Sequence, residues 1–146
     1  MIVYMAHAID AAGPDTKSEI DTVSKSAAEA LREYARGGEG VAIFSPYFAW
    51  CRGYNEEVSE VNRSVIHKCD FLIAILTPEC FGTIREIEYA RTVAEIPVVM
   101  IVPSVSHFTK HIESAGLIVT QMKFVLNHPL SWAKEVMEEV SSQNGV

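Results

Sequence analysis

The sequence contains little cysteine and no metal-binding spacing. Its three cysteines, Cys51, Cys69 and Cys80, form no C-x-x-C pair among the 146 residues. An odd and scattered set of thiols excludes a disulfide framework and a zinc site built on thiolates. The histidines do not offer metal-ligand spacing either, so we expect no bound metal. This concerns four of the five histidines, namely His67, His107, His111 and His128.

Positive charge and long hydrophobic runs are also scarce. The chain has 12 Lys and Arg against 19 Asp and Glu, a net charge of −7. This balance argues against polymeric nucleic acid or an anionic membrane as a partner, because both require clustered basic residues. No apolar run approaches the length of a membrane span, and the chain reaches Asp10 without the basic residues of a signal peptide. We therefore expect a cytoplasmic protein with no membrane partner.

Several familiar phosphate and nucleophile motifs are missing. There is no G-x-G-x-x-G after the first apolar run, no P-loop and no G-x-S-x-G elbow. The segment from His7 to Asp10 is a poor phosphate loop for a flavodoxin, and Ala74 to Thr77 lacks the aspartate that a receiver domain needs. Dinucleotide, nucleoside triphosphate and receiver functions are thus not expected.

Short apolar runs do alternate regularly with helical patterns. Strands are predicted over residues 2–6, 41–44, 71–76, 97–102 and 117–122. Helices are predicted from Asp15 or Thr16 to the glycines at 37–38, from 55 to about 68 with Val58, Val61 and Val65 inward, from 82–83 to about 94, over 106–114, and from 127–129 onward.

This alternation predicts an α/β fold in one domain spanning residues 1–146. The first, third and fourth strands are continuous apolar runs, as expected for a parallel sheet covered on both faces. Five strands in this length suit a flavodoxin-like, doubly wound, five-stranded parallel sheet of order 2-1-3-4-5. Ligands of such sheets bind beyond the carboxyl ends of the strands, so the loops at 6–10 and 77–82 should face one crevice.

One carboxylate, Glu86, lies beside this predicted crevice. The run Thr83-Ile84-Arg85-Glu86 matches a helix capping box, in which Glu86 bonds back to the Thr83 backbone N–H. Alternatively, Glu86 is a nucleophile or charge stabiliser at an electrophilic carbon. The pattern alone leaves both interpretations open.

Three segments resemble the nucleoside 2-deoxyribosyltransferase family, which also contains nucleoside 5′-monophosphate N-glycosidases. They are the apolar strand at 70–76 that starts with Asp70, the G-x-x-x-E-[LI]-x-[YW]-A motif at 82–90, and Ile96-Pro97-Val98-Val99. Tyr4 near the end of the first strand also fits, and the similarity covers residues 1–105 or so.

The resemblance implies an enzyme that needs no cofactor and acts on a small nucleoside or nucleotide. Glu86 would attack C1′ of the sugar and form a glycosyl-enzyme ester, which a second base or water then releases. Tyr4 would hydrogen-bond Glu86 and orient it. Members of the family usually form homo-oligomers in which a neighbour helps to close the site, so we expect at least a dimer.

The residues expected to bind substrate depart from the family in three places. Asn62 stands where the family commonly has an Asp; an amide can read a base edge but cannot deliver a proton. Asp10, Glu57, Glu60 or His7 would then protonate the base, or the base would leave with less help from a proton donor. Cys80 occupies a position that is Asp in the transferases and Ser in the monophosphate hydrolases. Asp10 and His7 replace phosphate-binding residues, and an Asp there repels a phosphate, which favours a nucleoside. Arg85, Lys17 and the backbone N–H groups of Gly82 to Ile84 can offset this repulsion.

An aromatic loop follows the second predicted strand. Tyr47, Phe48 and Trp50 can either stack on a base or pack at a dimer contact. Two other functions stay open: a nucleoside 5′-monophosphate N-glycosidase and, in another class, a non-catalytic module that binds a nucleoside or nucleotide.

Overall fold

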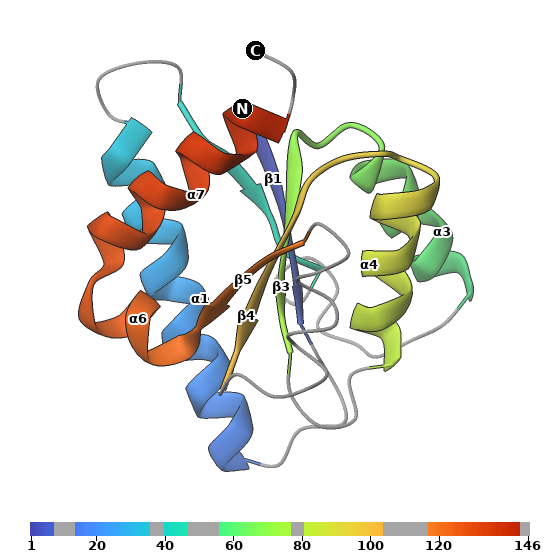
Figure 1. The fold of residues 1–146 in the computed structure, drawn as a ribbon. Coiled ribbons are helices and arrows are strands. Elements are labelled where there is room, and N and C mark those ends of the chain that lie inside the picture. Colours follow the sequence, from blue (N-terminus) through green and yellow to red (C-terminus); the bar gives the residue numbers. More distant parts are fainter. Residues whose placement is uncertain (8–13, 36–39, 47–55, 77–80, 104–116, 144–146) are drawn as a thin grey trace.

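The chain folds around one parallel sheet of five strands (Figure 1). A computed structural model describes residues 1–7, 14–35, 40–46, 56–76, 81–103 and 117–143. The sheet order is β2-β1-β3-β4-β5, which confirms the predicted flavodoxin-like topology. Its strands are β1 (Ile2–His7), β2 (Ala42–Phe44), β3 (Phe71–Ile75), β4 (Val98–Val102) and β5 (Ile118–Gln121).

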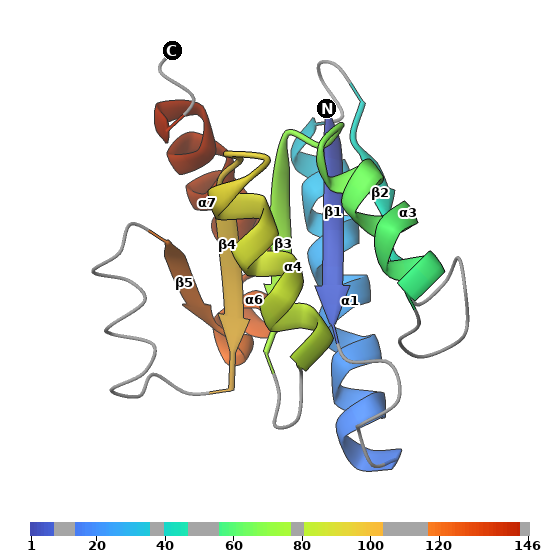
Figure 2. The ribbon, with the colours of Figure 1, turned by 90° about the vertical axis from the view of Figure 1, so that its right-hand side faces the viewer.

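Helices cover both faces of the sheet, as the views in Figure 1 and Figure 2 show. One face carries α1 (Pro14–Tyr34), α6 (Met122–Asn127) and α7 (Pro129–Gln143), and the other carries α3 (Glu56–Ile66) and α4 (Phe81–Thr92). The short helix α6 was not predicted. It follows β5 directly and buries Met122 and Val125, which are three residues apart and so share one helix face.

Strand alternation divides the interior into two hydrophobic cores. Val3 and Met5 of β1 pack with the α1, α6 and α7 side, whereas Tyr4 and Ala6 pack with the α3 and α4 side. All five residues of β3 and all five of β4 are buried, which explains their uninterrupted apolar sequences. Neighbouring side chains of β1 therefore face different environments, and a polar group on Tyr4 belongs to the α3 and α4 layer.

The inward face of α3 differs from the prediction. Val61 is 43% exposed, whereas Asn62 is only 7% exposed and lies one turn before the fully buried Ile66. The prediction for Val61 was wrong because α3 is rotated so that positions 62 and 66 face the interior. Val65 is partly buried against the same core, and the Val58 side chain lies outside the described part. The rotation directs an amide, not an apolar side chain, into this layer.

Polar contacts join the starts of β1 and β3 and connect α7 to β5. Asp70 accepts a hydrogen bond from the Ile2 backbone N–H through Oδ2 at 2.7 Å, and its own N–H donates to the Ile2 carbonyl at 2.8 Å. The Trp132 indole Nε1 donates to Thr120 Oγ1 at 3.2 Å and joins α7 to β5. Within the described residues, none of the helices combines the length and apolar character needed to cross a membrane.

Candidate active site

The fold brings Tyr4 and Glu86 together in the layer between the sheet and α4. Tyr4 lies in β1, pairs with Phe44 and Leu72 on the neighbouring strands, and is completely buried. Glu86 lies in the second turn of α4, the helix that packs on β1 and β3. As a residue Glu86 is partly exposed, but its Oε2 atom is buried from solvent. A carboxylate oxygen and a phenol hydroxyl thus share one buried layer.

The two groups perturb each other's protonation. Burial raises the pKa of Glu86 from 4.5 to about 7, and the interaction with the Tyr4 hydroxyl opposes this rise. Burial, followed by the negative charge of Glu86, raises the pKa of Tyr4 far above its ordinary value of 10.0. Tyr4 therefore stays a protonated hydrogen-bond donor at any physiological pH, while Glu86 changes charge close to neutrality.

Three buried polar atoms of this layer have no hydrogen-bond partner: Tyr4 Oη, Glu86 Oε2 and Thr83 Oγ1. Tyr4 and Glu86 are close enough to interact electrostatically but lie outside good hydrogen-bond geometry. Such pairs often tighten only when a ligand binds. Unpaired buried polar groups are costly, at about 1–3 kcal/mol each. Three in one layer indicate a place where a polar molecule would supply the missing partners.

The capping box predicted for Thr83 and Glu86 is wrong. Helix α4 begins at Phe81, so Thr83 lies inside the helix instead of preceding it. A capping Thr would accept the Glu86 backbone N–H, yet the Thr83 hydroxyl has no partner. Thr83 is 2% exposed and, three residues from Glu86, shares its helix face. Capping therefore does not account for Glu86.

Asn62 contributes an amide to the same layer from α3, the helix next to α4 on this face of the sheet. It is on the buried face of α3 with Ile66, and Ile66 and the nearby Cys69, which follows the helix, belong to the core that contains Tyr4. Cys69 also adds a small electrostatic effect on Tyr4, and burial raises the pKa of its own thiol to about 11. A neutral thiol with its hydrogen bond to the Val65 carbonyl, at 3.2 Å, is a packing residue.

His7 lies at the carboxyl end of β1, on the other side of the pleat from Tyr4. His7 alternates with Tyr4 and Ala6 along β1, so its position in the pleat is that of Met5, on the α1 side. It is 7% exposed at the carboxyl end of the strand. Gly82 lies in the first turn of α4, where a Cβ atom would meet nothing within 4 Å. Lack of space for a side chain therefore does not explain why residue 82 is a glycine.

Several predicted site residues lie outside the described part of the chain. They are Asp10, Tyr47, Phe48, Trp50 and Cys80, together with the side chain of Glu57. One contact was missed by sequence reasoning: the Phe44 ring lies 5.6 Å from the Tyr4 ring at an interplanar angle of 33°. Its signal was available, since Phe44 ends the second strand next to the predicted crevice. Phe44 fixes one side of the Tyr4 ring.

The described residues contain no group of three or more His, Cys, Asp or Glu side chains arranged to hold a metal ion. Among the described residues, the polar groups that the layer brings together include one carboxylate, one phenol, one threonine hydroxyl and one amide. This donor set suits hydrogen bonding to a sugar or base, and its one carboxylate is the anion available to an electron-poor carbon.

Comparison with known proteins defines the fold and leaves the reaction open. No protein-family model and no curated protein matches the chain. Among solved structures, an oxidoreductase from Corynebacterium diphtheriae is similar with 10% identity and a TM-score of 0.50, over 94% of this chain and 96% of that one.

Two further structures are similar at lower TM-scores. A 2-deoxyribosyltransferase from Leishmania mexicana has 20% identity and a TM-score of 0.48, over 80% of this chain and 71% of that one. The flavoenzyme FerB, an NAD(P)H:(acceptor) oxidoreductase from Paracoccus denitrificans, has 16% identity and a TM-score of 0.41, over 82% and 74%. At these identities the likenesses do not distinguish one reaction from another.

Proposed function

We propose that this chain cleaves or exchanges the N-glycosidic bond of a nucleoside or deoxynucleoside, with the Glu86 carboxylate as nucleophile. The observation that carries the proposal is the Glu86 carboxylate beside Tyr4, with a buried Oε2 that has no partner. Burying a carboxylate without full pairing costs free energy, and such groups concentrate at functional sites. The motif at residues 82–90 places this glutamate where the nucleoside 2-deoxyribosyltransferase family has its nucleophile.

The proposed reaction has two steps that use the same carboxylate. An ionised Glu86 oxygen bonds to C1′ as the C1′–N bond breaks, and the electron pair leaves with the base, which takes up a proton. A second base or water then attacks C1′ and releases Glu86 as a carboxylate. The Tyr4 hydroxyl lowers the pKa of Glu86 and so favours the ionised nucleophile, and it donates to Glu86 when the pair tightens around the substrate. No cofactor takes part.

Substrate binding is assigned to the polar groups around this pair. Asn62 reads the base edge, and the unpaired Thr83 hydroxyl and the first turn of α4 at Gly82 bind the sugar side. The proposal extends to His7, Asp10, Tyr47, Phe48, Trp50 and Cys80 as further substrate contacts. A nucleoside is favoured over a 5′-monophosphate because Asp10 replaces a phosphate-binding residue. A homo-oligomeric state and a cytoplasmic location also remain predictions.

The test is release of free base from a panel of nucleosides, deoxynucleosides and 5′-monophosphates, followed by chromatography. Glu86→Gln should lower the rate of base release by several orders of magnitude, because an amide oxygen cannot form the ester. Glu88→Gln, an exposed carboxylate two residues along the same helix, is the matched control and should retain parental activity. Activity of Glu86→Gln within about threefold of the parent would refute the nucleophile, since that corresponds to only about 0.7 kcal/mol.

One observation favours a second function, a nucleoside-binding module without catalysis. Asn62 occupies the place where an acid could protonate the leaving base, and an amide cannot do so. A non-catalytic module would bind a nucleoside with a measurable affinity and release no base. Its Glu86→Gln variant would bind the nucleoside as tightly as the parent does. The same panel, read by calorimetry as well as chromatography, separates the two functions.

A further inference from the structure

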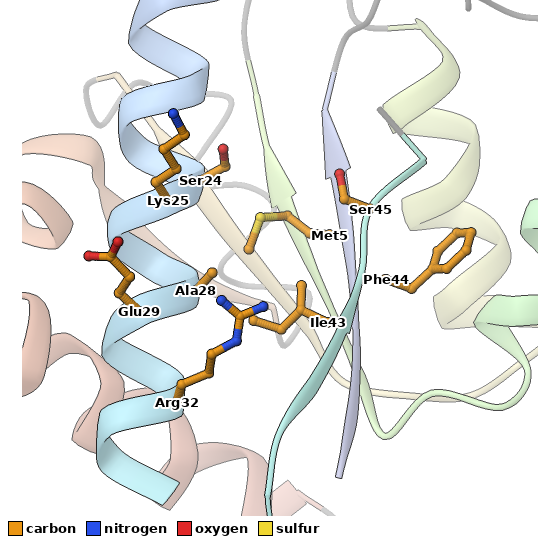
Figure 3. Close-up of a pocket in the computed structure, with 9 residues that line it drawn as sticks. All are labelled: Met5, Ser24, Lys25, Ala28, Glu29, Arg32, Ile43, Phe44 and Ser45. Atoms are coloured by element: carbon orange, nitrogen blue, oxygen red, sulfur yellow. The ribbon is translucent and has the colours of Figure 1, made fainter. Parts of the chain in front are cut away.

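A second recess lies on the opposite face of the sheet from Glu86. It is a groove of about 440 Å³ between α1 and the edge strand β2, and Met5 and Ile43 form its apolar floor (Figure 3). Met5 alternates with Tyr4 along β1, so the groove and the Tyr4–Glu86 layer are separated by the sheet itself. Phe44 lines the edge of this groove and also contacts the Tyr4 ring, but the proposed role of Glu86 does not depend on the groove.

One end of the groove carries hydroxyl groups. Ser45, which follows β2, is 7% exposed, and its buried Oγ has no hydrogen-bond partner. Ser24 of α1 is 2% exposed and donates to the Asp21 carbonyl at 3.1 Å, so its oxygen remains an acceptor. In Figure 3 the two serines lie across from each other, and Lys25 extends from α1 at the same end. An oxygen-bearing ligand would supply the partner that Ser45 lacks.

The other end of the groove carries a guanidinium. Figure 3 shows Arg32 reaching from α1 toward Ile43. Lys25 and Arg32 are seven residues apart on one helix, which separates them by about 10 Å along its axis. No ion pair joins either cation to an acidic group among the described residues. Glu29 also lines the groove, but its carboxylate points away from β2. The groove therefore has a positive group near each end and an apolar middle.

We propose that this groove binds a small organic dianion of the α,ω-dicarboxylate class. One carboxylate pairs with Arg32, whose planar guanidinium can donate two parallel hydrogen bonds. The other accepts from Ser45 Oγ and lies near Lys25. The methylene chain rests on Met5 and Ile43. A chain of about eight carbons matches the axial separation of about 10 Å between helix positions 25 and 32, whereas a four-carbon dianion falls well short of it.

The experiment is calorimetric titration of the full chain with octanedioate, butanedioate and octanoate at low ionic strength. Octanedioate should bind one to one, and at least about fivefold more tightly than the other two, because only it engages both ends. Equal affinity for octanoate, or no octanedioate binding up to about 10 mM, a concentration at which even a weak specific site would fill, would overturn the proposal.

Variants connect the binding to named groups. Arg32→Gln should weaken octanedioate about tenfold and Ser45→Ala about fivefold, whereas Glu29→Gln should strengthen it two- to threefold by removing a like charge. Lys134→Gln, an exposed cation on α7, is the matched control and should bind as the parent does. Because the Ser45 hydroxyl has no partner, Ser45→Ala should keep the parental melting midpoint. Unchanged binding in both Arg32→Gln and Ser45→Ala would place the ligand elsewhere.

This outcome is independent of the proposed reaction. Glu86→Gln lies across the sheet and should bind octanedioate with parental affinity. In the parent chain, absence of base release with intact dicarboxylate binding, or base release without dicarboxylate binding, therefore tells which of the two proposals has failed.

Discussion

Glu86 combines two properties that a solvated surface carboxylate lacks. Burial holds its pKa at about 7, and the Tyr4 hydroxyl acts against that burial by favouring the anion. Tyr4 itself cannot ionise near neutrality, because burial and the charge of Glu86 both raise its pKa. The pair thus consists of a permanent donor and a carboxylate whose charge depends on pH in the working range.

Tyr4→Phe tests this division of roles. Removing the hydroxyl removes the interaction that lowers the pKa of Glu86, so the acid limb of kcat/KM should move from near pH 7 to higher pH. Activity at pH 6 should fall more than activity at pH 8.5. Tyr89→Phe, on the same helix as Glu86, is the control. An unmoved acid limb in Tyr4→Phe would show that Tyr4 does not act through Glu86.

Asn62 gives a second prediction for a single residue. Asn62→Asp introduces a group that can be partly protonated at mildly acidic pH and then donate to a leaving base. Base preference should change, or turnover should rise below about pH 6, in the panel of nucleosides. Asn127→Asp, an exposed amide at the end of α6, controls for the added charge. A profile identical to that of the parent would mean that Asn62 does not contact the base.

At the level of elements, the position of α4 on the sheet decides what its first turns do. The helix starts at Phe81 and directs Thr83 and Glu86 to the same buried side. Asp70, just before β3, joins the start of β1 through two hydrogen bonds with Ile2. The segments that carry the family resemblance therefore contain a structural aspartate, Asp70, and a candidate nucleophile, Glu86.

Thr83→Val distinguishes ligand binding from helix capping. Loss of a capping threonine costs about 1 kcal/mol, whereas loss of a buried hydroxyl that has no partner is close to neutral. We expect the urea midpoint of Thr83→Val to stay at or above that of the parent, while KM for the best substrate rises several-fold. A clear drop in stability with unchanged KM would restore the capping role.

For the molecule as a whole, the sheet separates two chemically different layers. The α3 and α4 side holds the Tyr4–Glu86 pair with its unpaired polar atoms, and the α1 side holds the tightly packed core around Trp132 and the groove beside β2. A carboxylate retained in the first layer at a raised pKa must influence the stability of the entire fold.

The free energy of unfolding should therefore depend on pH through Glu86. Its pKa is about 7 in the folded chain and 4.5 in the unfolded reference. Between these values the folded state holds a proton that the unfolded state has lost, so stability falls as pH rises through this window. The loss is at most about 3 kcal/mol and is complete above the folded pKa.

Glu86→Gln lacks this titration, so its stability relative to the parent should increase from pH 5 to pH 8. Urea unfolding at both values, with Glu88→Gln as the control, measures the difference. A constant difference between Glu86→Gln and the parent would mean that the folded pKa of Glu86 is not raised.

The amino-acid sequence alone was enough to predict the sheet and its topology and to single out Glu86 as the candidate carboxylate. Continuous apolar runs of Val, Ile and Leu are typical of parallel strands buried on both faces, and their regular alternation with helical patterns predicted the fold. The roles of Thr83, Val61 and Asn62 depended on tertiary structure, because the start of α4 and the rotation of α3 are set by packing against the sheet. Three further features depend on side chains that are distant in sequence: the raised pKa of Glu86, the contact between Phe44 and Tyr4, and the groove beside β2. Local sequence patterns cannot predict contacts of this kind.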